Sequence, residues 1–287
     1  MESIRKWVYN DTTPSSELYA KEEDCFTCIS PCEEHPSYPS YLQIKTDRAI
    51  ASTVKPYERH ILISTGKKDW PKKIEDDQDS IAEALLSTRP NRSTMISSSS
   101  ILTTYSNIPD AQDLIILPDN IIIANVTSSN IDQLWSFLEN NNNKELSSSL
   151  TSTATNKEYG GITIIPSPYS ALILICSHGR RDKRCGVTAP ILGREFDRIL
   201  RDKDDSDDIE IVYVSHIGGH KIAGNVICYT HQSTRGIWYG LVKPCHVDAI
   251  VKQTIENGKI IHSLYRGCMA NSFNDHPSTI KKSLFSW

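Results

Sequence analysis

The segment ILICSHGRRD at residues 173–182 has a near copy, ILISTGKKD, at residues 61–69. Each copy is an apolar, largely β-branched run followed by a short basic turn, which is typical of a buried strand that ends in a surface loop. The similarity continues downstream, where LIILPDNIIIANV at 114–126 parallels NVICYTHQSTRGIWYGLV at 225–242 as a hairpin with a longer turn. A helical segment that opens IDQL or VDAI closes each unit. The sequence therefore predicts a duplicated α/β unit.

Hydrophobic periodicity predicts the secondary structure along the rest of the chain. Short β-branched runs indicate buried strands, and amphipathic segments between them indicate helices. The predicted strands are 61–64, 114–117, 121–126, 162–165, 172–175, 209–214, 226–229 and 237–242, and the predicted helices are 79–86, 131–139, 190–201 and 247–257. Strands that alternate with helices favour layered α/β domains.

Chain length and two low-complexity stretches predict the domain organisation. The chain has 287 residues, and because domains of roughly 100 to 150 residues are the commonest, two are expected. A serine run at 97–100 and an Asn/Ser/Thr-rich stretch at 140–156 interrupt the chain, and the second has the composition of a linker. We therefore predict an N-terminal domain at 1–155, a C-terminal domain at 156–270 and a tail at 271–287.

Composition and charge narrow the classes of function. A net charge of -4 and a pI near 6.1 give no overall polyanion-binding field, so nucleic acid is not an expected partner. Apolar runs stay well short of the ~20 residues of a membrane span, and the start MESIRKWVYN lacks the apolar core of a secretory signal. We expect a cytoplasmic protein without a membrane association. The phosphate-binding, dinucleotide-binding and hydrolase motifs GxxxxGK, GxGxxG and GxSxG are absent from the sequence, which disfavours those enzyme classes.

Four metal-binding side chains follow two consecutive predicted strands of the second copy. Cys176 ends one strand, and the polar loop SHGRRDKR leads from it to Cys185. His216 and His220 follow the next strand, and their i, i+4 spacing puts both imidazoles on one side if the segment turns helically. In the first copy Ser64 replaces Cys176 and no histidine pair follows. Only the second copy is therefore expected to hold a metal.

A structural zinc ion is an alternative use of two cysteines and two histidines. Zinc fingers usually separate their cysteines by about two to four residues, whereas eight residues lie between Cys176 and Cys185. The wide loop favours a binuclear iron-sulfur cluster. A zinc-stabilised interaction module remains the alternative.

Longer motifs resemble a known family. These are ISTGKKDWP at 63–71, CSHGRRDKRCG at 176–186, SHIGGHKIAGNVI at 215–227 and GIWYGLVKP at 236–244, of which the second and third are specific. They resemble the motifs of fungal sucrase/ferredoxin-like proteins, and the resemblance covers most of the chain. That family is similar to thioredoxin-fold 2Fe-2S ferredoxins in which histidines replace the second pair of cysteines.

The resemblance implies a fold and a cofactor. It implies that Cys176 and Cys185 hold one iron of a 2Fe-2S cluster while His216 and His220 hold the other. It also implies a thioredoxin-like α/β fold for the C-terminal half, the ferredoxin domain. Together with the repeat, this predicts two tandem thioredoxin-like domains, of which the N-terminal one is a copy without a cluster.

The ligand charges indicate what such a centre would do. Two ferric ions, two sulfides, two thiolates and two neutral imidazoles sum to zero, whereas four thiolates would leave a charge of about -2, so histidine ligation raises the potential, as in Rieske centres. Protonation of the distal imidazole nitrogens on reduction would make that potential pH-dependent. We expect an electron carrier rather than an enzyme, with unknown donor and acceptor proteins. The loop between Cys176 and Cys185 has a net positive charge that would steer an acidic electron donor. It contains four basic residues and one acidic residue, Asp182; the basic ones are Arg180, Arg181, Lys183 and Arg184.

A second group of potential ligands lies near the N-terminus. Cys25, Cys28, Cys32 and His35 in CFTCISPCEEH have a spacing compatible with a zinc or redox cluster, or with a thiol-bearing arm. The enzymatic alternative is a thioredoxin-like thiol oxidoreductase that uses Cys25 and Cys28 or Cys185.

The C-terminal tail ends in LFSW, an apolar end to a polar segment. It resembles the C-terminal tryptophan tripeptide by which client proteins are recognised by the cytosolic iron-sulfur assembly targeting machinery, although Phe285 stands where an aliphatic residue is usual. We therefore expect that machinery to bind through Trp287.

Overall fold

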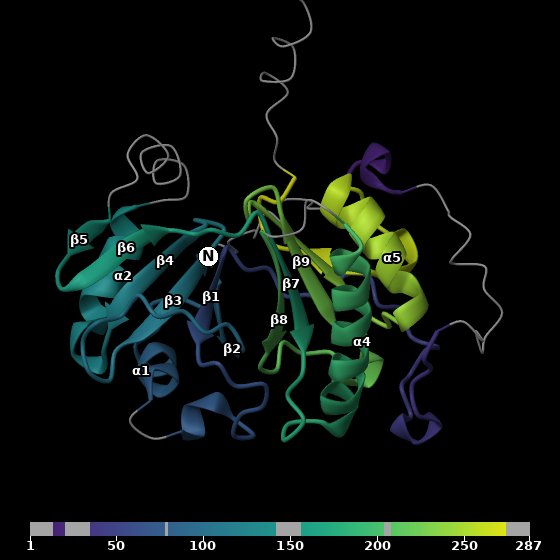
Figure 1. The fold of residues 1–287 in the computed structure, drawn as a ribbon, viewed down its shortest axis with the longest axis horizontal. Helices are drawn as coiled ribbons and strands as arrows, with labels where there is room; N and C mark the ends of the chain where they lie inside the picture. Colours follow the sequence, from purple (N-terminus) through teal and green to yellow (C-terminus); the bar gives the residue numbers. More distant parts are fainter. Residues whose placement is uncertain (1–13, 21–34, 78–79, 142–155, 204–207, 274–287) are drawn as a thin grey trace, which may run out of the picture.

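The computed structural model describes residues 14–20, 35–77, 80–141, 156–203 and 208–273. Within these residues, eleven strands form one mixed sheet in the order β11-β10-β9-β7-β8-β2-β1-β3-β4-β6-β5 (Figure 1). The N-terminal and C-terminal halves of the chain occupy the two halves of this sheet. In the described part of the chain, no helix is long and apolar enough to cross a membrane.

The N-terminal half contains a β-α-β unit, a hairpin and a closing helix. Strands β1 and β2 are parallel and joined through α1, β3 and β4 are antiparallel, and α2 follows. Ser80 caps α1 because its side chain accepts a hydrogen bond from the Glu83 N–H at 3.1 Å. The bounds are β1 Arg59–Ser64, α1 Ile81–Thr88, β2 Thr94–Ser99, β3 Gln112–Leu117, β4 Ile121–Val126, α2 Ile131–Asn140, β5 Lys157–Tyr159 and β6 Ile162–Pro166.

The C-terminal half repeats this order of elements, as the sequence predicts. Parallel β7 and β8 are joined through α4, the antiparallel β9 and β10 form a hairpin, and a helix follows. Both halves therefore have the thioredoxin-like arrangement, and the fold is α/β. The bounds are β7 Ala171–Cys176, α4 Lys183–Arg201, β8 Ile209–Val214, β9 Val226–Thr230, β10 Arg235–Tyr239, α5 Val247–Ala249 with its π-helical continuation Ile250–Glu256, and β11 Tyr265–Cys268. Short 3-10 helices are Ser16–Leu18, Ser40–Leu42, Ile74–Asp76, Ser128–Asn130, His220–Ile222, Pro244–His246 and His262–Leu264.

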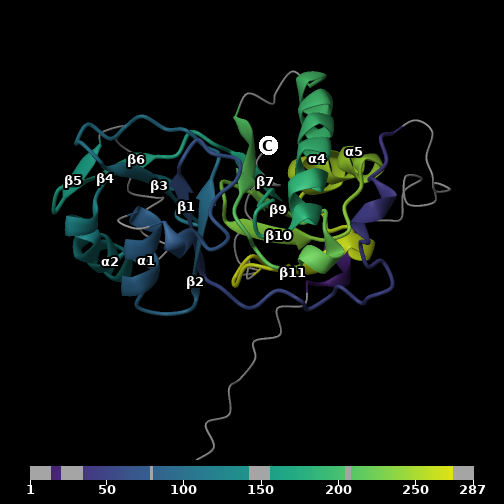
Figure 2. The same cartoon turned by 90° about the horizontal axis from the view of Figure 1, so that it is seen from below.

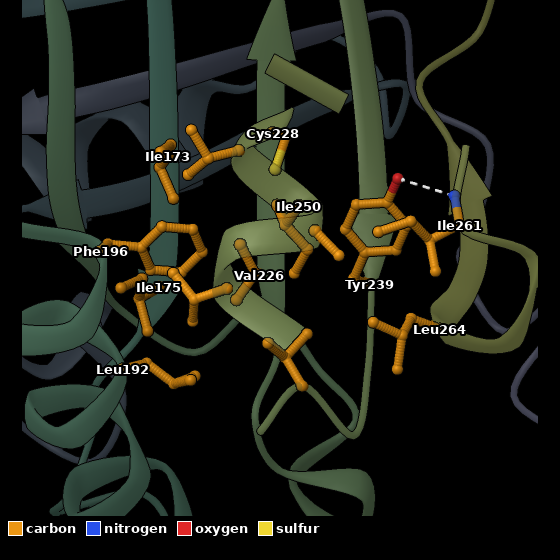
Figure 3. Close-up of a cluster of buried hydrophobic side chains, with 14 of the residues drawn as sticks. Ile173, Ile175, Leu192, Phe196, Val226, Cys228, Tyr239, Ile250, Ile261 and Leu264 are labelled. Carbon is orange, nitrogen blue, oxygen red and sulfur yellow. Dashed lines mark hydrogen bonds between the residues drawn. The ribbon is translucent and has the colours of Figure 1, made fainter. Parts of the chain in front are cut away.

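The core of the C-terminal half lies between its sheet and its helices (Figure 3). Ile173 and Ile175 of β7 face Phe196 of α4, and all three are essentially inaccessible to solvent. Tyr239 satisfies its hydroxyl within this core by accepting a hydrogen bond from the Ile261 N–H at 3.2 Å. This packing holds the start of α4 against the end of β7, where the predicted ligands lie.

The two halves pack against each other through their helix-free faces. β2 and β8 meet at the pair Ser99 and Val214, and apolar side chains of both half-sheets form one shared core. The hydroxyls of Tyr57 and Tyr229 hydrogen-bond across this core at 2.9 Å. The helices of the two halves lie on opposite outer sides (Figure 2). The chain is therefore built as two similar units with a common interior.

Two sequence predictions about local structure differ from the structure. The serine run at 97–100 is not an interruption, because residues 97–99 belong to the buried strand β2, where the Ser99 hydroxyl donates to the Ile63 carbonyl at 2.8 Å. The helix predicted at residues 190–201 begins earlier, at Lys183, so that Pro190 lies inside it. After residue 155, β6 pairs with β4 and β5 pairs with β6, so the chain enters the second half of the sheet only after Pro166. The division into two domains itself remains a prediction.

Candidate metal centre

Two buried cysteines lie where β7 ends and α4 begins. Cys176 is the last residue of β7, and Cys185 lies in the first turn of α4. Asp182 caps that helix by accepting a hydrogen bond from the Arg184 N–H at 3.0 Å. Each cysteine is 1% exposed. The sequence placed Cys185 in a loop before the helix, whereas the helix itself positions it.

The two histidines are brought together by a left-handed turn rather than by a helix. His216 follows β8, and His220 opens the 3-10 helix His220–Ile222. Between them Gly218 and Gly219 have φ values of 89° and 76°, which glycine adopts far more readily than other residues. The imidazole ring centroids lie 5.3 Å apart. The sequence prediction that the rings share one side is therefore confirmed, although the helical turn it invoked does not form.

Three of the four predicted ligands lie close together, and the fourth, His220, lies beside one of them. One ligand atom from each of Cys176, Cys185 and His216 lies within 4.8 Å of the others, and the His220 ring adjoins that of His216. The Nδ1 atoms of both histidines are buried and have no hydrogen-bond partner among the described residues. A buried polar atom without a partner is costly. Two thiols beside two unpartnered imidazole nitrogens form a donor set that fits a metal ion or an iron-sulfur cluster.

Of the two neighbouring thiols, one is favoured to ionise and the other to stay protonated. A hydrogen bond from the Cys185 thiol lowers the pKa of Cys176 well below its usual range, and the nearby His216 side chain lowers it further, against the opposing effect of burial. The same contact with Cys176, together with burial, raises the pKa of Cys185. Burial also lowers the pKa of His220, which favours a neutral imidazole. These are the protonation states that metal ligands need, at least for one thiolate and for His220.

His178 fixes the backbone of His216. The His178 Nδ1 accepts a hydrogen bond from the His216 N–H at 3.0 Å, so the proton of this ring lies on Nε2. That nitrogen donates to the carbonyls of Pro71 at 2.8 Å and Trp70 at 3.1 Å. His178 is 1% exposed. The sequence left its role open, and the structure places it between the ligand loop and the N-terminal half.

The loop of the first copy packs directly on the ligand loop of the second. The Ser177 hydroxyl donates to the Lys68 carbonyl at 2.7 Å, and the Arg180 N–H donates to Asp69 at 3.2 Å. Both partners belong to the ISTGKKDWP motif. The N-terminal copy thus forms one wall of the candidate site, a role that the motif itself did not reveal.

Arg266 brings a buried positive charge to the site. Its guanidinium donates to Asn225 Oδ1 at 2.7 Å and to Thr53 Oγ1 at 3.0 Å. It also lies beneath the glycine turn, because a Cβ on Gly219 would come within 2.8 Å of it. Burial lowers the pKa of Arg266 to about 10, and the nearby cysteine sulfurs oppose that decrease. Sequence spacing gave no signal for this residue.

Most of the other predicted functional residues are not described by the structure. Cys25, Cys28, Cys32 and Trp287 lie outside the described residues, so the predictions that rest on them remain untested. His35 is described and lies 4.0 Å from a carboxylate oxygen of Glu195 on α4.

Comparison with known proteins identifies the family. The family model described as sucrase/ferredoxin-like matches residues 50–267, which is most of the chain. The chain belongs to the sucrase/ferredoxin-like family. Among curated members of similar sequence, "Altered inheritance of mitochondria protein 32" of Meyerozyma guilliermondii is 47% identical over 96 residues, which is 33% of this chain and 34% of that protein. "Actin patches distal protein 1" of Saccharomyces cerevisiae is 44% identical over 93 residues, or 30% and 29% of the two chains. The aligned part thus spans about a third of the length of these relatives.

Among solved structures, a thioredoxin-like 2Fe-2S ferredoxin from Aquifex aeolicus is similar to part of this family member. It is 22% identical, with a TM-score of 0.27, and the match covers 35% of this chain and 93% of the ferredoxin. A second structure of the wild-type ferredoxin gives a TM-score of 0.25 with 33% of this chain covered.

Proposed function

We propose that this protein is a cytoplasmic one-electron carrier that holds a 2Fe-2S cluster through Cys176, Cys185, His216 and His220. The observation that carries the proposal is the burial of two imidazole Nδ1 atoms, without partners among the described residues, beside two buried thiols. When bound, such a cluster supplies reversible uptake of a single electron. Membership of the sucrase/ferredoxin-like family supports an iron-sulfur redox role.

The surrounding residues hold this donor set and set its charge. His178 orients His216 through the backbone, while the buried guanidinium of Arg266 favours added negative charge nearby. The His220 side chain is 36% exposed, and its Nε2 lies 3.9 Å from Asp182. A proton taken up at that nitrogen would be stabilised by the carboxylate. The proposal therefore includes a potential that rises as pH falls.

Burial argues against the thiol oxidoreductase alternative where the structure describes its cysteines. A redox thiol must meet the disulfide of its substrate, and reactive cysteines are therefore partly exposed. Cys176 and Cys185 are each 1% exposed. Their burial is therefore more consistent with a role as metal ligands than with nucleophilic attack on a disulfide of a second protein.

The test is spectroscopy of the full chain after anaerobic reconstitution, with iron, sulfide and zinc quantified in the same sample. We expect a coloured protein with about two irons and two sulfides per chain and an EPR signal after reduction. Cys176→Ser and His216→Ala should lose the chromophore, whereas Cys245→Ala, which removes a thiol outside the site, should keep it. Colourless protein with one bound zinc would establish the zinc alternative, and thiol-disulfide activity that survives iron removal would establish the oxidoreductase alternative.

We also propose that the C-terminal Trp287 recruits the cytosolic iron-sulfur assembly targeting machinery. Deletion of Trp287 should lower iron incorporation in cells while reconstitution in vitro stays unchanged, because the four ligands remain in place. Mössbauer or metal analysis of protein purified from cells measures the first effect, and the absorbance of reconstituted protein measures the second. Equal iron contents with and without Trp287 would refute this role.

A further inference from the structure

Basic residues gather on two loops, one from each half of the molecule. The loops are residues 67–73, after β1, and residues 179–184, after β7. Together they contain eight basic and two acidic residues, although the chain as a whole has a net charge of -4. The basic residues are Lys67, Lys68, Lys72, Lys73, Arg180, Arg181, Lys183 and Arg184, and all are exposed except the half-buried Arg184.

Hydrogen bonds hold the two loops side by side. Besides the contacts of Ser177 and His178, the Arg181 guanidinium donates to the Lys72 carbonyl at 3.3 Å. The basic residues therefore form one surface, which we call the two-loop surface, rather than two separate patches. This surface contains the loop that links Cys176 to Cys185, so it lies directly over the candidate metal centre.

The acidic residues of these loops leave most of the positive charge uncompensated. Asp182 pairs with the Arg184 guanidinium at 2.8 Å, and Asp69 lies 3.9 Å from the Arg180 guanidinium. Six basic residues remain beyond these two pairs. The positive end of α4, which begins at Lys183, adds to the same field. Glu75 and Asp76 follow the first loop on a separate 3-10 helix and oppose this charge only at its far end.

A groove lies between the two loops. It has a volume of about 450 Å³. Lys68, Lys183 and the single acidic residue Asp69 line it on the charged side, and Val187, Pro190 and Tyr213 provide an apolar side. Lys68 is held over the Tyr213 ring, with its Nζ 5.0 Å from the ring centroid. The groove thus combines two lysines with apolar walls next to the basic loops.

We propose that the two-loop surface is the docking site of an acidic redox protein that exchanges electrons with this chain. The inference rests on the proposed function, because one of the two loops links Cys176 to Cys185, two of the ligands assigned to the cluster. Positive charge steers an acidic partner and orients it toward the site. The N-terminal copy, in which no cluster ligands are predicted, supplies about half of this surface. Its role is therefore to build the docking site.

The experiment uses flavodoxin, an acidic flavoprotein, as the probe and the full chain as the binding partner. Binding is measured by fluorescence anisotropy of labelled flavodoxin at ionic strengths of about 0.01 M and about 0.15 M. Electron transfer is measured by stopped flow: the flavin hydroquinone gives up one electron and becomes the semiquinone, while the chain gains that electron. Basic cytochrome c serves as the probe of opposite sign.

The decisive variant is Lys67→Glu/Lys68→Glu, which changes the N-terminal half and leaves the ligand loop intact. We expect its flavodoxin affinity and its second-order rate constant to fall about tenfold at low ionic strength, with little effect at high ionic strength. Lys67→Gln/Lys68→Gln should give an intermediate loss. The matched control, Arg92→Glu/Arg201→Glu, changes the net charge equally at residues before β2 and at the end of α4, and it should bind like the unaltered protein.

Three outcomes overturn the proposal: flavodoxin binding that does not depend on salt, equal losses in the Lys67/Lys68 and control variants, or cytochrome c binding as tightly as flavodoxin. Iron is quantified in every sample to separate this inference from the proposed function. If the chain binds iron but does not bind flavodoxin, the docking site is refuted while the cluster assignment is unaffected. If flavodoxin binds as expected but no cluster forms, the proposed function is refuted, and so is the redox role of the surface.

Discussion

Arg266 is a buried charged side chain close to Cys176 and Cys185, where a fixed cation would favour the reduced form of the proposed cluster. Arg266→Gln should therefore lower the midpoint potential. A unit charge near a buried site at an effective dielectric of about 20 contributes on the order of 1 to 2 kcal/mol, which corresponds to roughly 40 to 90 mV. A redox titration followed by EPR measures the shift, and Arg92→Gln serves as the control. An unchanged potential in Arg266→Gln would show that its charge does not act on the site.

His178 acts at the same scale through position rather than charge. His178→Ala removes the acceptor for the His216 N–H and the link to Trp70 and Pro71. Loss of a residue that orients a metal ligand typically costs about 10- to 100-fold in metal affinity. We expect the reconstituted chromophore to bleach at least about tenfold faster in a chelator challenge, whereas the exposed His231→Ala should bleach at the normal rate. Equal bleaching rates would remove His178 from the site.

These residues mark the limit of what the sequence could predict about the site. The sequence could predict Cys176, Cys185, His216 and His220 as ligands because they lie in two local motifs that follow strand ends, and local motifs are visible in a linear pattern. Trp70 and Pro71, which accept hydrogen bonds from His178, lie more than 100 positions away in the chain. Arg266 comes from the last strand. Contacts of this range depend on how two half-sheets pack, and no spacing rule encodes that.

Among the elements, the loop that leads into β9 has the strictest steric requirement. Gly224 has a φ of 87°, and a Cβ there would lie 2.3 Å from the Val242 carbonyl oxygen. Because this neighbour is backbone that also donates to the Gly224 carbonyl, it cannot move aside. Gly224→Ala should lower the free energy of unfolding by at least about 2 kcal/mol in urea denaturation.

The matched control for Gly224 is Gly161→Ala. Gly161 has nearly the same φ, 86°, but its nearest neighbour would lie 3.9 Å from an added Cβ. It therefore tests the backbone strain alone, which costs about 1 kcal/mol. Equal losses in the two variants would mean that the contact with Val242 relaxes.

The elements also show why the predicted ranges were partly wrong. The strands of the repeat were found because their runs are rich in Ile, Val and Leu, whereas β2 reads TMISSS and lacks that signal. Hydropathy counts its serines as polar, yet they are buried: the Ser99 hydroxyl donates to the Ile63 carbonyl, and the Ser97 hydroxyl bonds to the His60 ring. Pro190 suggested a helix start, but the capping Asp182 begins α4 earlier, and the helix continues through the proline.

For the whole molecule, polar side chains link the two halves within the shared core. His60 of β1 is fully buried in that core, with Nδ1 2.9 Å from the Tyr229 hydroxyl and Nε2 3.0 Å from the Ser97 hydroxyl. Tyr57 extends this chain of contacts to Trp238, whose indole donates to its hydroxyl at 2.8 Å. The polar side chains of the two halves therefore hydrogen-bond across the junction. Removing one of them leaves the others without a partner.

This junction should make stability pH-dependent. Burial lowers the pKa of His60 from 6.5 to about 3, so below pH 6.5 the unfolded chain binds a proton that the folded chain excludes. The contribution of neutral His60 to the free energy of unfolding is then fully present above pH 6.5. It decreases as the pH falls toward 3, and the loss is about 2 kcal/mol at pH 5. His246, whose pKa burial lowers to about 4, should add to this loss. Urea unfolding of the metal-free protein at pH 7.5 and pH 5 measures the total change.

His60→Gln separates the contribution of the junction from that of the other groups. Glutamine keeps a donor and an acceptor but cannot be protonated in this range, so the variant should be less stable at pH 7.5 yet lose about 2 kcal/mol less than the unaltered protein between pH 7.5 and pH 5. His246→Gln gives the corresponding comparison outside the junction. If His60→Gln keeps the full pH dependence, His60 is protonated as readily in the folded protein as in the unfolded chain, and burial at the junction does not lower its pKa.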